Sequence, residues 1–185
     1  MSWLMLIVGI ALWWLAHLFK RLAPDLRASL GGLGKPGVAV VLLLSVVLMV
    51  IGYGGIDYLD VWQPPGFMVH VNNLLMLIAL FLFTPAARRG RVIYGMRHPM
   101  LAGFKVWAFA HLLVNGDLAS IVLFASLLAW AVVEMIVINR AEGSFEVSGD
   151  VGSLRNDALF LVGSIGVLFL VGYLHAWFGV WPFPG

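Results

Sequence analysis

Long apolar segments alternate along the chain with shorter segments that are polar or contain glycine and proline. An apolar run of this length is typical of a helix that crosses a lipid bilayer. We predict membrane-spanning helices at Ser2–Phe19, Val38–Ile56, Phe67–Ala86, Pro99–Asn115, Leu118–Ile138 and Asp157–Phe178. The sequence shows no internal repeat and no low-complexity segment. We therefore expect one all-α domain over residues 1–185, a polytopic bundle of about six transmembrane helices.

The positive charges fall on one side of this arrangement. They lie in the connections after the first, third and fifth helices, or just inside a helix end: Lys20, Arg21, Arg27, Lys35, Arg88, Arg89, Arg91, Arg97, Lys105, Arg140 and Arg155. The other side carries only Asp57, Asp60 and Asp117. The positive-inside rule then predicts cytoplasmic basic connections and both termini outside. We expect a multi-pass protein of a bacterial-type inner (cytoplasmic) membrane.

Composition supports a membrane protein and excludes several kinds of site. The 185 residues are 62% hydrophobic and 11% charged, whereas soluble domains are about half apolar and a quarter charged. There is no cysteine, which excludes disulfides, thiolate metal ligands, iron–sulfur clusters and covalent c-type haem. The sequence shows no nucleophile–base pair and no phosphate-binding loop. We expect no nucleic-acid partner.

The fourth and fifth helices are predicted to form a hairpin through the short sequence "NGD". Pro99 suits the first turn of a helix, where its missing N–H is not needed. Gly116 is expected to end the fourth helix in the left-handed conformation, and Asp117 to cap the next one. The two helices should therefore be antiparallel neighbours.

Pairing residues outward from this turn at equal rise places Glu134 opposite Pro99. An unpaired carboxylate inside a membrane helix is unfavourable. We therefore predict that Glu134 contacts Arg97 or His98. Lys105 lies deeper in the same helix, and its ammonium is expected to reach the basic surface along its flexible side chain.

Two intramembrane histidines are the candidates for chemistry. His17 shares an aromatic helix face with Arg21 one turn later, a pattern typical of a b-type haem ligand with a cation for a propionate. His111 shares a face of the fourth helix with Trp107. Bis-histidine coordination needs imidazoles from two helices. The other candidates are His70, His98 and His175.

Four segments together resemble the NnrU family of membrane proteins, whose plant relatives include 15-cis-ζ-carotene isomerase. The segments are "HLFKRLAPDLRASL" (17–30), "WQPPGFMVHVNNLLMLIALFL" (62–82), "RHPMLAGFKVWAFAHLLVNGDLASIVLFASLLAWAVVE" (97–134) and "RNDALFLVGSIGVLFLVGYLHAWFGVWP" (155–182). The resemblance covers nearly the whole chain. The central segment is specific, because its RHP, W-x-x-x-H and NGD motifs occur in order at the family's spacing.

The resemblance implies bound haem b. Carried over by motif, the axial ligands fall on His17 and His111, and the plant enzymes' nearby cysteine falls on Ala108. By helix rise these two histidines differ in depth by about 10 Å, so His98 remains an alternative metal ligand. The cofactor-binding set predicted with the histidines is Arg21, Arg97 and Trp107.

The expected function follows from the same resemblance. The plant relatives convert a cis double bond of a carotenoid to trans, so a haem-dependent cis–trans isomerase is the candidate enzyme. More generally, we expect redox-linked chemistry on a membrane lipid or carotenoid-like ligand. The bacterial members are associated with denitrification. The alternative is a non-enzymatic membrane factor that supports the expression or assembly of nitrite or nitric oxide reductase, with reductase subunits as partners.

Two other functions are weaker alternatives. The RHP motif also resembles membrane isoprenylcysteine and phospholipid methyltransferases, which bind S-adenosylmethionine. The chain lacks their C-terminal paired glutamates and arginine and has only "NRAEGSFEVSGD" after the fifth helix. A small-molecule transporter ranks last, because the two halves of the chain show no repeat.

Overall fold

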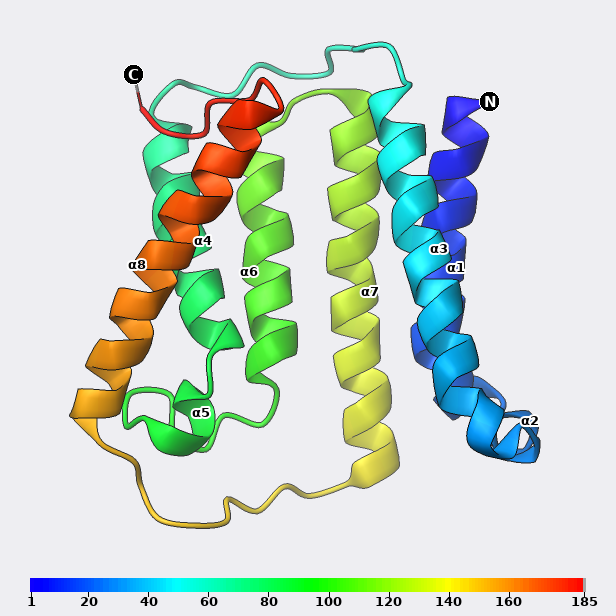
Figure 1. Ribbon diagram of the computed structural model, residues 1–185, viewed down its shortest axis with the longest axis vertical. Coiled ribbons are helices and arrows are strands. Elements are labelled where there is room, and N and C mark those ends of the chain that lie inside the picture. The colour runs from blue at the N-terminus through cyan, green and yellow to red at the C-terminus, as the bar shows by residue number, and fades with distance from the viewer. Residues whose placement is uncertain (185) are drawn as a thin grey trace.

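Six long apolar helices run side by side in the computed structural model, which describes residues 1–184 (Figure 1). They are α1 (Ser2–Leu22), α3 (Gly34–Gly54), α4 (Met68–Phe83), α6 (Pro99–Val114), α7 (Leu118–Glu142) and α8 (Leu154–Trp177). Shorter helices lie in the connections: α2 (Pro24–Ser29), η1 (Gly31–Leu33) and α5 (Ala86–Arg89). The all-helical fold predicted from the sequence is confirmed.

Four of these helices are long and apolar enough to cross a membrane by length and composition, namely α1, α3, α7 and α8. The helices α4 and α6 have 16 residues each. At 1.5 Å per residue each is about 24 Å long, against a hydrocarbon core of roughly 30 Å. The two short helices pack against each other and are flanked by α7 and α8. These features indicate a multi-pass membrane protein.

The helices pack in the spatial order α3, α1, α7, α6, α4, α8, each chiefly against the next. The first pair is close because glycines lie at the crossing. A Cβ added at Gly9 would lie 2.8 Å from the backbone nitrogen of Met49, and one at Gly52 would lie 2.4 Å from that of Leu6. Small residues let helix backbones approach in this way. By contrast, α8 packs on α4 and α5 at the edge of the row.

The two ends of the bundle differ in charge. Both termini lie at one end, with the connections 55–67 and 115–117, and we call this the terminal end (Figure 1). The connections 23–33, 84–98 and 143–153 lie at the other end, which we call the basic end. The basic connections therefore gather as the sequence predicted. Their cytoplasmic location remains a prediction.

The turn between α6 and α7 is held by the connection 55–67. Asp117 caps α7 as predicted, because its Oδ1 accepts a hydrogen bond from the Ser120 amide at 2.9 Å. The left-handed conformation predicted for Gly116 is wrong. Its carbonyl instead accepts hydrogen bonds from the amides of Val61 and Trp62, at 3.0 and 3.1 Å. A Cβ at Gly116 would lie 1.7 Å from the Trp62 carbonyl oxygen, so glycine is needed for this close approach.

The predicted contact of Glu134 with Arg97 or His98 is also wrong. The His98 Nε2 atom lies 2.8 Å from Asn139 Oδ1, and Arg97 lies 3.7 Å from the carboxylate of Glu142. Both partners are further along α7 than Glu134. Arg97 and His98 precede α6 in non-helical backbone, which advances more per residue than a helix does. Counting outward from the turn at equal helical rise therefore gave the wrong partners for Arg97 and His98.

The connection between α4 and α6 is attached to the start of α8. Asp157 Oδ2 accepts hydrogen bonds from the amides of Arg91 and Val92, at 2.7 and 3.1 Å. Asn156 Nδ2 donates to the carbonyl of Arg89 at 2.7 Å. The backbone N–H groups thus satisfy Oδ2 of this buried carboxylate, whereas its Oδ1 has no partner among residues 1–184.

Candidate functional site

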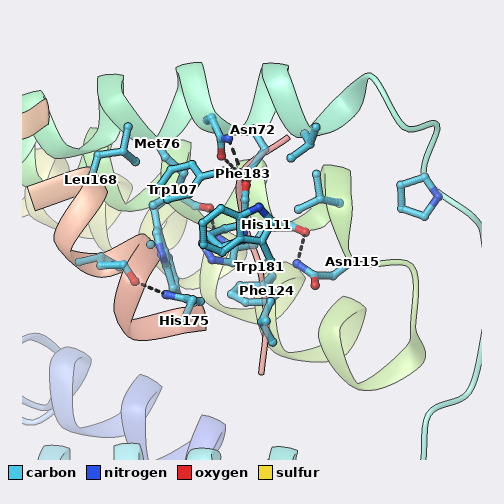
Figure 2. Close-up of a pocket in the computed structure, with 18 of the residues that line it drawn as sticks. Asn72, Met76, Trp107, His111, Asn115, Phe124, Leu168, His175, Trp181 and Phe183 are labelled. Atoms are coloured by element: carbon cyan, nitrogen blue, oxygen red, sulfur yellow. Dashed lines mark hydrogen bonds between the residues drawn. The ribbon is translucent and has the colours of Figure 1, made fainter. Parts of the chain in front are cut away.

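A cavity of about 590 Å³ lies at the terminal end between α4, α6, α7 and α8 (Figure 2). Pockets that bind small molecules commonly have volumes of about 300–1,000 Å³ and largely apolar walls. The aromatic side chains of this wall come from helices and from the C-terminal segment: Tyr53, Trp107, Phe124, Trp181 and Phe183. The cavity is thus large enough for a small organic ligand.

Two segments that look like simple surface turns in the sequence line this cavity. One is Pro64–Gly66 in the connection before α4, and the other is Trp181–Phe183 after α8. Asn73 Nδ2 donates to the Pro182 carbonyl at 3.1 Å. The Phe183 ring lies so close to Gly172 that an added Cβ would be 2.2 Å from its Cζ. The C-terminal segment is therefore folded back onto α4 and α8 as part of the wall.

His111 projects from α6 into the cavity lining, as Figure 2 shows. Its Nδ1 lies 2.9 Å from the Trp107 carbonyl oxygen. A carbonyl can only accept a hydrogen bond, so Nδ1 carries the proton and Nε2 keeps a lone pair. The ring packs against Phe124 on α7 with centroids 4.6 Å apart, and against Trp107 at 5.0 Å. These contacts fix the imidazole in one orientation.

His175 on α8 lines the same cavity with the same hydrogen-bond arrangement. Its Nδ1 lies 2.8 Å from the Val171 carbonyl, so its proton also lies on Nδ1. Within residues 1–184, neither His111 nor His175 has a hydrogen-bond partner at Nε2. A histidine that donates from Nδ1 to a carbonyl and leaves Nε2 free is arranged as metal-binding histidines are.

Asn72 adds an unsatisfied polar atom to the cavity wall. The residue is 7% exposed, and its Nδ2 donates to Asn73 Oδ1 at 3.0 Å. Its Oδ1 is buried and has no partner in the part of the chain that the structure describes. Buried polar atoms are rarely left unpaired in folded proteins. A donor on a bound ligand, or a water molecule, would satisfy this oxygen.

His17 lies outside this cavity lining, in an aromatic cluster nearer the basic end. Its ring is 4.3 Å from that of Trp13 on α1 and 4.4 Å from that of Trp130 on α7. Its Nδ1 donates to the Trp13 carbonyl at 2.9 Å. The tautomer is therefore the same as that of His111, but the surroundings are packed indole rings.

A continuous row of rings separates the two predicted axial ligands. From His17 the row passes through Trp130, Phe104 and Trp107 to His111. Beyond the first contact, each step is 5.0 Å between ring centroids. The structure does not bring His17 and His111 to one cavity, because these side chains fill the space between them.

The other predicted site residues divide between the two ends. Trp107 lines the cavity with its neighbour His111. Arg21 pairs with Glu142 at 2.5 Å, and Arg97 lies 3.7 Å from the same carboxylate. His98, the alternative ligand, lies at the start of α6 near these arginines. The structure therefore gathers the cations at the basic end, across the bundle from the cavity.

The Lys105 ammonium does not follow the expectation that it reaches the basic surface. Its side chain is half-buried between α6 and α7, and its Nζ lies 3.6 Å from the sulfur of Met135. A thioether is only a weak acceptor. The ammonium thus lies beside α7 rather than at the end of the bundle.

Sequence reasoning named His175 only as one of several candidates and did not place it with His111 in one cavity, and it missed the role of the α4 start. A usable signal was present in "VHVNN", because adjacent asparagines inside an apolar helix need partners. In the described region, no group of three or more histidine, aspartate or glutamate side chains is placed to hold a metal ion.

Comparison with known proteins gives one match. The family model described as NnrU protein matches residues 5–182, nearly the whole chain, and all five histidines fall within the match. No curated protein and no solved structure matches at a significant level.

Proposed function

Because this chain belongs to the NnrU family, we propose that it binds haem b in the cavity at the terminal end, where His111 and His175 would hold the group. One observation carries the proposal. Two imidazoles on different helices line one cavity, and each has its Nε2 lone pair free because Nδ1 is bonded to a helix carbonyl. Axial haem ligands need this tautomer, and bis-histidine coordination needs two helices.

The walls suit a flat, mostly apolar group. Trp107 and Phe124 hold the His111 ring between them, and Trp181 and Phe183 add aromatic surface from the C-terminal segment. Among the described lining residues there is no lysine or arginine. Arg21 and Arg97 are engaged at the basic end, so haem propionates would rely on water.

The chain's own residues would orient the group and limit access to it. The hydrogen bond from His111 Nδ1 to the Trp107 carbonyl sets the ring orientation and raises the basicity of Nε2. The Pro64–Gly66 and Trp181–Phe183 segments cover the cavity at the terminal end. Bound haem would supply one-electron redox chemistry.

We place the substrate in the hydrophobic class, a membrane lipid or a carotenoid-like molecule. The support is the apolar cavity wall and its location among helices that face a bilayer. Ala108, which matches the cysteine of the plant isomerases, is fully buried against its neighbours. Any isomerisation here would therefore proceed without a thiolate ligand.

The test is the absorption spectrum of the full chain, purified in detergent after expression with added haem. We expect a Soret band with the visible bands of low-spin bis-histidine haem. His111→Ala should weaken haem binding by at least about tenfold. Loss of a group that only hydrogen-bonds to a metal ligand already has an effect of about this size, and loss of the ligand itself should have a larger one. His70→Ala is the matched control, since His70 is exposed at the start of α4. A missing Soret band, or an identical spectrum in His111→Ala, would contradict the proposal.

A further inference from the structure

A second group of polar atoms is buried between α1 and α7, where the row of rings begins near the basic end. It consists of Trp13 and His17 on α1, and Trp130 and Glu134 on α7, and we call it the indole–carboxyl cluster. Each pair is separated by four residues, so both members lie on one helix face. The rings of Trp13 and Trp130 are 5.2 Å apart, and each lies within 4.4 Å of the His17 ring.

Three atoms of this cluster lack hydrogen bonds. Trp13 Nε1, Trp130 Nε1 and Glu134 Oε2 are all buried and have no partner among residues 1–184. Trp130 is 4% exposed and Glu134 is 9% exposed. Two donors and a carboxyl oxygen in an apolar bundle are unfavourable unless something satisfies them. Because His17 Nδ1 donates to the Trp13 carbonyl, its Nε2 atom keeps a lone pair and adds a further acceptor.

The surroundings limit what this partner can be. The rings are in contact, with centroids 4.3–5.2 Å apart, so a partner can lie only at their edges and must be very small. The Glu134 carboxyl disfavours an anion, and the Arg21 guanidinium, one turn beyond His17, disfavours a cation. Lys105 on the facing helix α6 lies beside Met135 and adds positive charge. A small neutral molecule that both donates and accepts hydrogen bonds remains, and water has these properties.

A polar track leads from the cluster to the basic end. Arg21 follows His17 by one turn, and Glu142 follows Glu134 by two turns on the same face of α7. Arg21 and Glu142 are paired, and the Glu142 side chain is 51% exposed. Trp13 lies nine residues before the end of α1, a depth of about 14 Å at 1.5 Å per residue.

We propose that the indole–carboxyl cluster binds ordered water, which enters beside the Arg21–Glu142 pair and bridges Trp13 Nε1, Trp130 Nε1 and Glu134 Oε2. Glutamate and histidine side chains within membrane helices commonly mark proton or ion pathways. Hydrated in this way, the cluster gives protons an aqueous route from the basic end into the bundle. The row through Phe104 and Trp107 separates this route from the cavity that contains His111.

The experiment is X-ray radiolytic hydroxyl labelling of the detergent-purified full chain, read by mass spectrometry. Radicals form at bound water, so a buried side chain beside ordered water is oxidised where a dry one is not. We expect Trp13 and Trp130 to be labelled despite their burial. Glu134→Leu should reduce this labelling several-fold, because it removes the acceptor. Glu134→Gln should retain it, because the amide still bridges.

The control is Glu146→Leu, in the exposed connection after α7, which should leave the labelling unchanged. If Glu134→Leu fails to fold, Trp130→Phe retains an aromatic ring at this position but removes one donor, and labelling of Trp13 should fall. Protected Trp13 and Trp130 beside labelled, exposed Trp177 would overturn the proposal, as would equal labelling in wild type and Glu134→Leu. Protein without added haem is used, so the result is independent of the proposed function.

Discussion

Single residues show how closely the packing depends on particular atoms. Gly116 lies in the turn between α6 and α7, whereas Gly163 lies inside α8. An added Cβ at Gly116 would meet the Trp62 carbonyl oxygen at 1.7 Å, whereas at Gly163 no described atom lies within 4 Å. Backbone at the first position cannot move without breaking the hydrogen bonds of the connection 55–67 to the turn. The same substitution should therefore have opposite effects at the two sites.

We predict that Gly116→Ala lowers the free energy of unfolding by about 1–3 kcal/mol, the usual effect of overpacking. Gly163→Ala should leave stability unchanged or raise it by up to about 1 kcal/mol, because alanine favours the helix. Thermal unfolding in detergent, followed by intrinsic tryptophan fluorescence, measures both. Equal melting temperatures for the two variants would show that the turn does not pack against Trp62 as described.

The residues predicted correctly from sequence are those whose roles are local. Pro99 at the start of α6 and Asp117 as the cap of α7 depend on the residues directly after them. Gly116 and Glu134 depend on partners that lie far away in the sequence or on a neighbouring helix. Periodicity records which face of a helix is apolar but not what packs against it, so the roles of these two residues were predicted wrongly.

At the level of elements, α8 is attached to the rest of the bundle by few contacts, chiefly with α4 and α5. Its first turn carries Asp157, whose carboxylate accepts hydrogen bonds from the backbone amides of Arg91 and Val92. This bond links the connection 84–98 to α8 at the basic end. The connection should therefore be held less firmly without this carboxylate, although Asn156 Nδ2 still donates to the Arg89 carbonyl.

Asp157→Ala leaves the two amides unpaired, which we expect to cost about 1–3 kcal/mol locally. The connection contains Arg88, Arg89 and Arg91, so trypsin should cleave it faster in this variant. Limited proteolysis with mass spectrometry gives the rate at these sites. Asp150→Ala, in the exposed connection before α8, is the matched control. Unchanged cleavage in Asp157→Ala would mean that the carboxylate does not hold the connection.

Hydrophobic periodicity located all six long helices, but it could not give their spatial order. The order α3, α1, α7, α6, α4, α8 depends on which glycines approach which backbones, as at Gly9 and Gly52. The sequence also could not show where α4 ends, because the predicted span continues to Ala86. At Thr84 the backbone becomes extended, and α4 ends there.

For the whole molecule, the predicted orientation in the membrane depends on the separation of charge between its two ends. The chain has no cysteine, so single cysteines can be introduced without background. Ser144→Cys lies in an exposed connection at the basic end, and Asp57→Cys is exposed at the terminal end. A membrane-impermeant maleimide that reaches the outer face of an intact cytoplasmic membrane should label Asp57→Cys. Ser144→Cys should react only after the membrane is opened, and the reverse pattern would invert the topology.

The candidate site could be predicted only in part. Its chemistry was visible in the sequence, because an intramembrane histidine such as His111 needs a partner. Its geometry was not, because the cavity combines four helices with the C-terminal segment. Motif comparison paired His111 with His17. The structure places Trp130, Phe104 and Trp107 between those two imidazoles and His175 in the lining with His111.

The haem proposal depends most on whether His175 or His17 binds haem together with His111. Haem-loaded His175→Ala and His17→Ala should be compared by absorption and electron paramagnetic resonance spectroscopy. We predict that His175→Ala loses the low-spin six-coordinate signal or the haem itself, whereas His17→Ala keeps the wild-type spectrum. Low-spin haem retained in His175→Ala but lost in His17→Ala would contradict the placement of haem in the cavity at the terminal end.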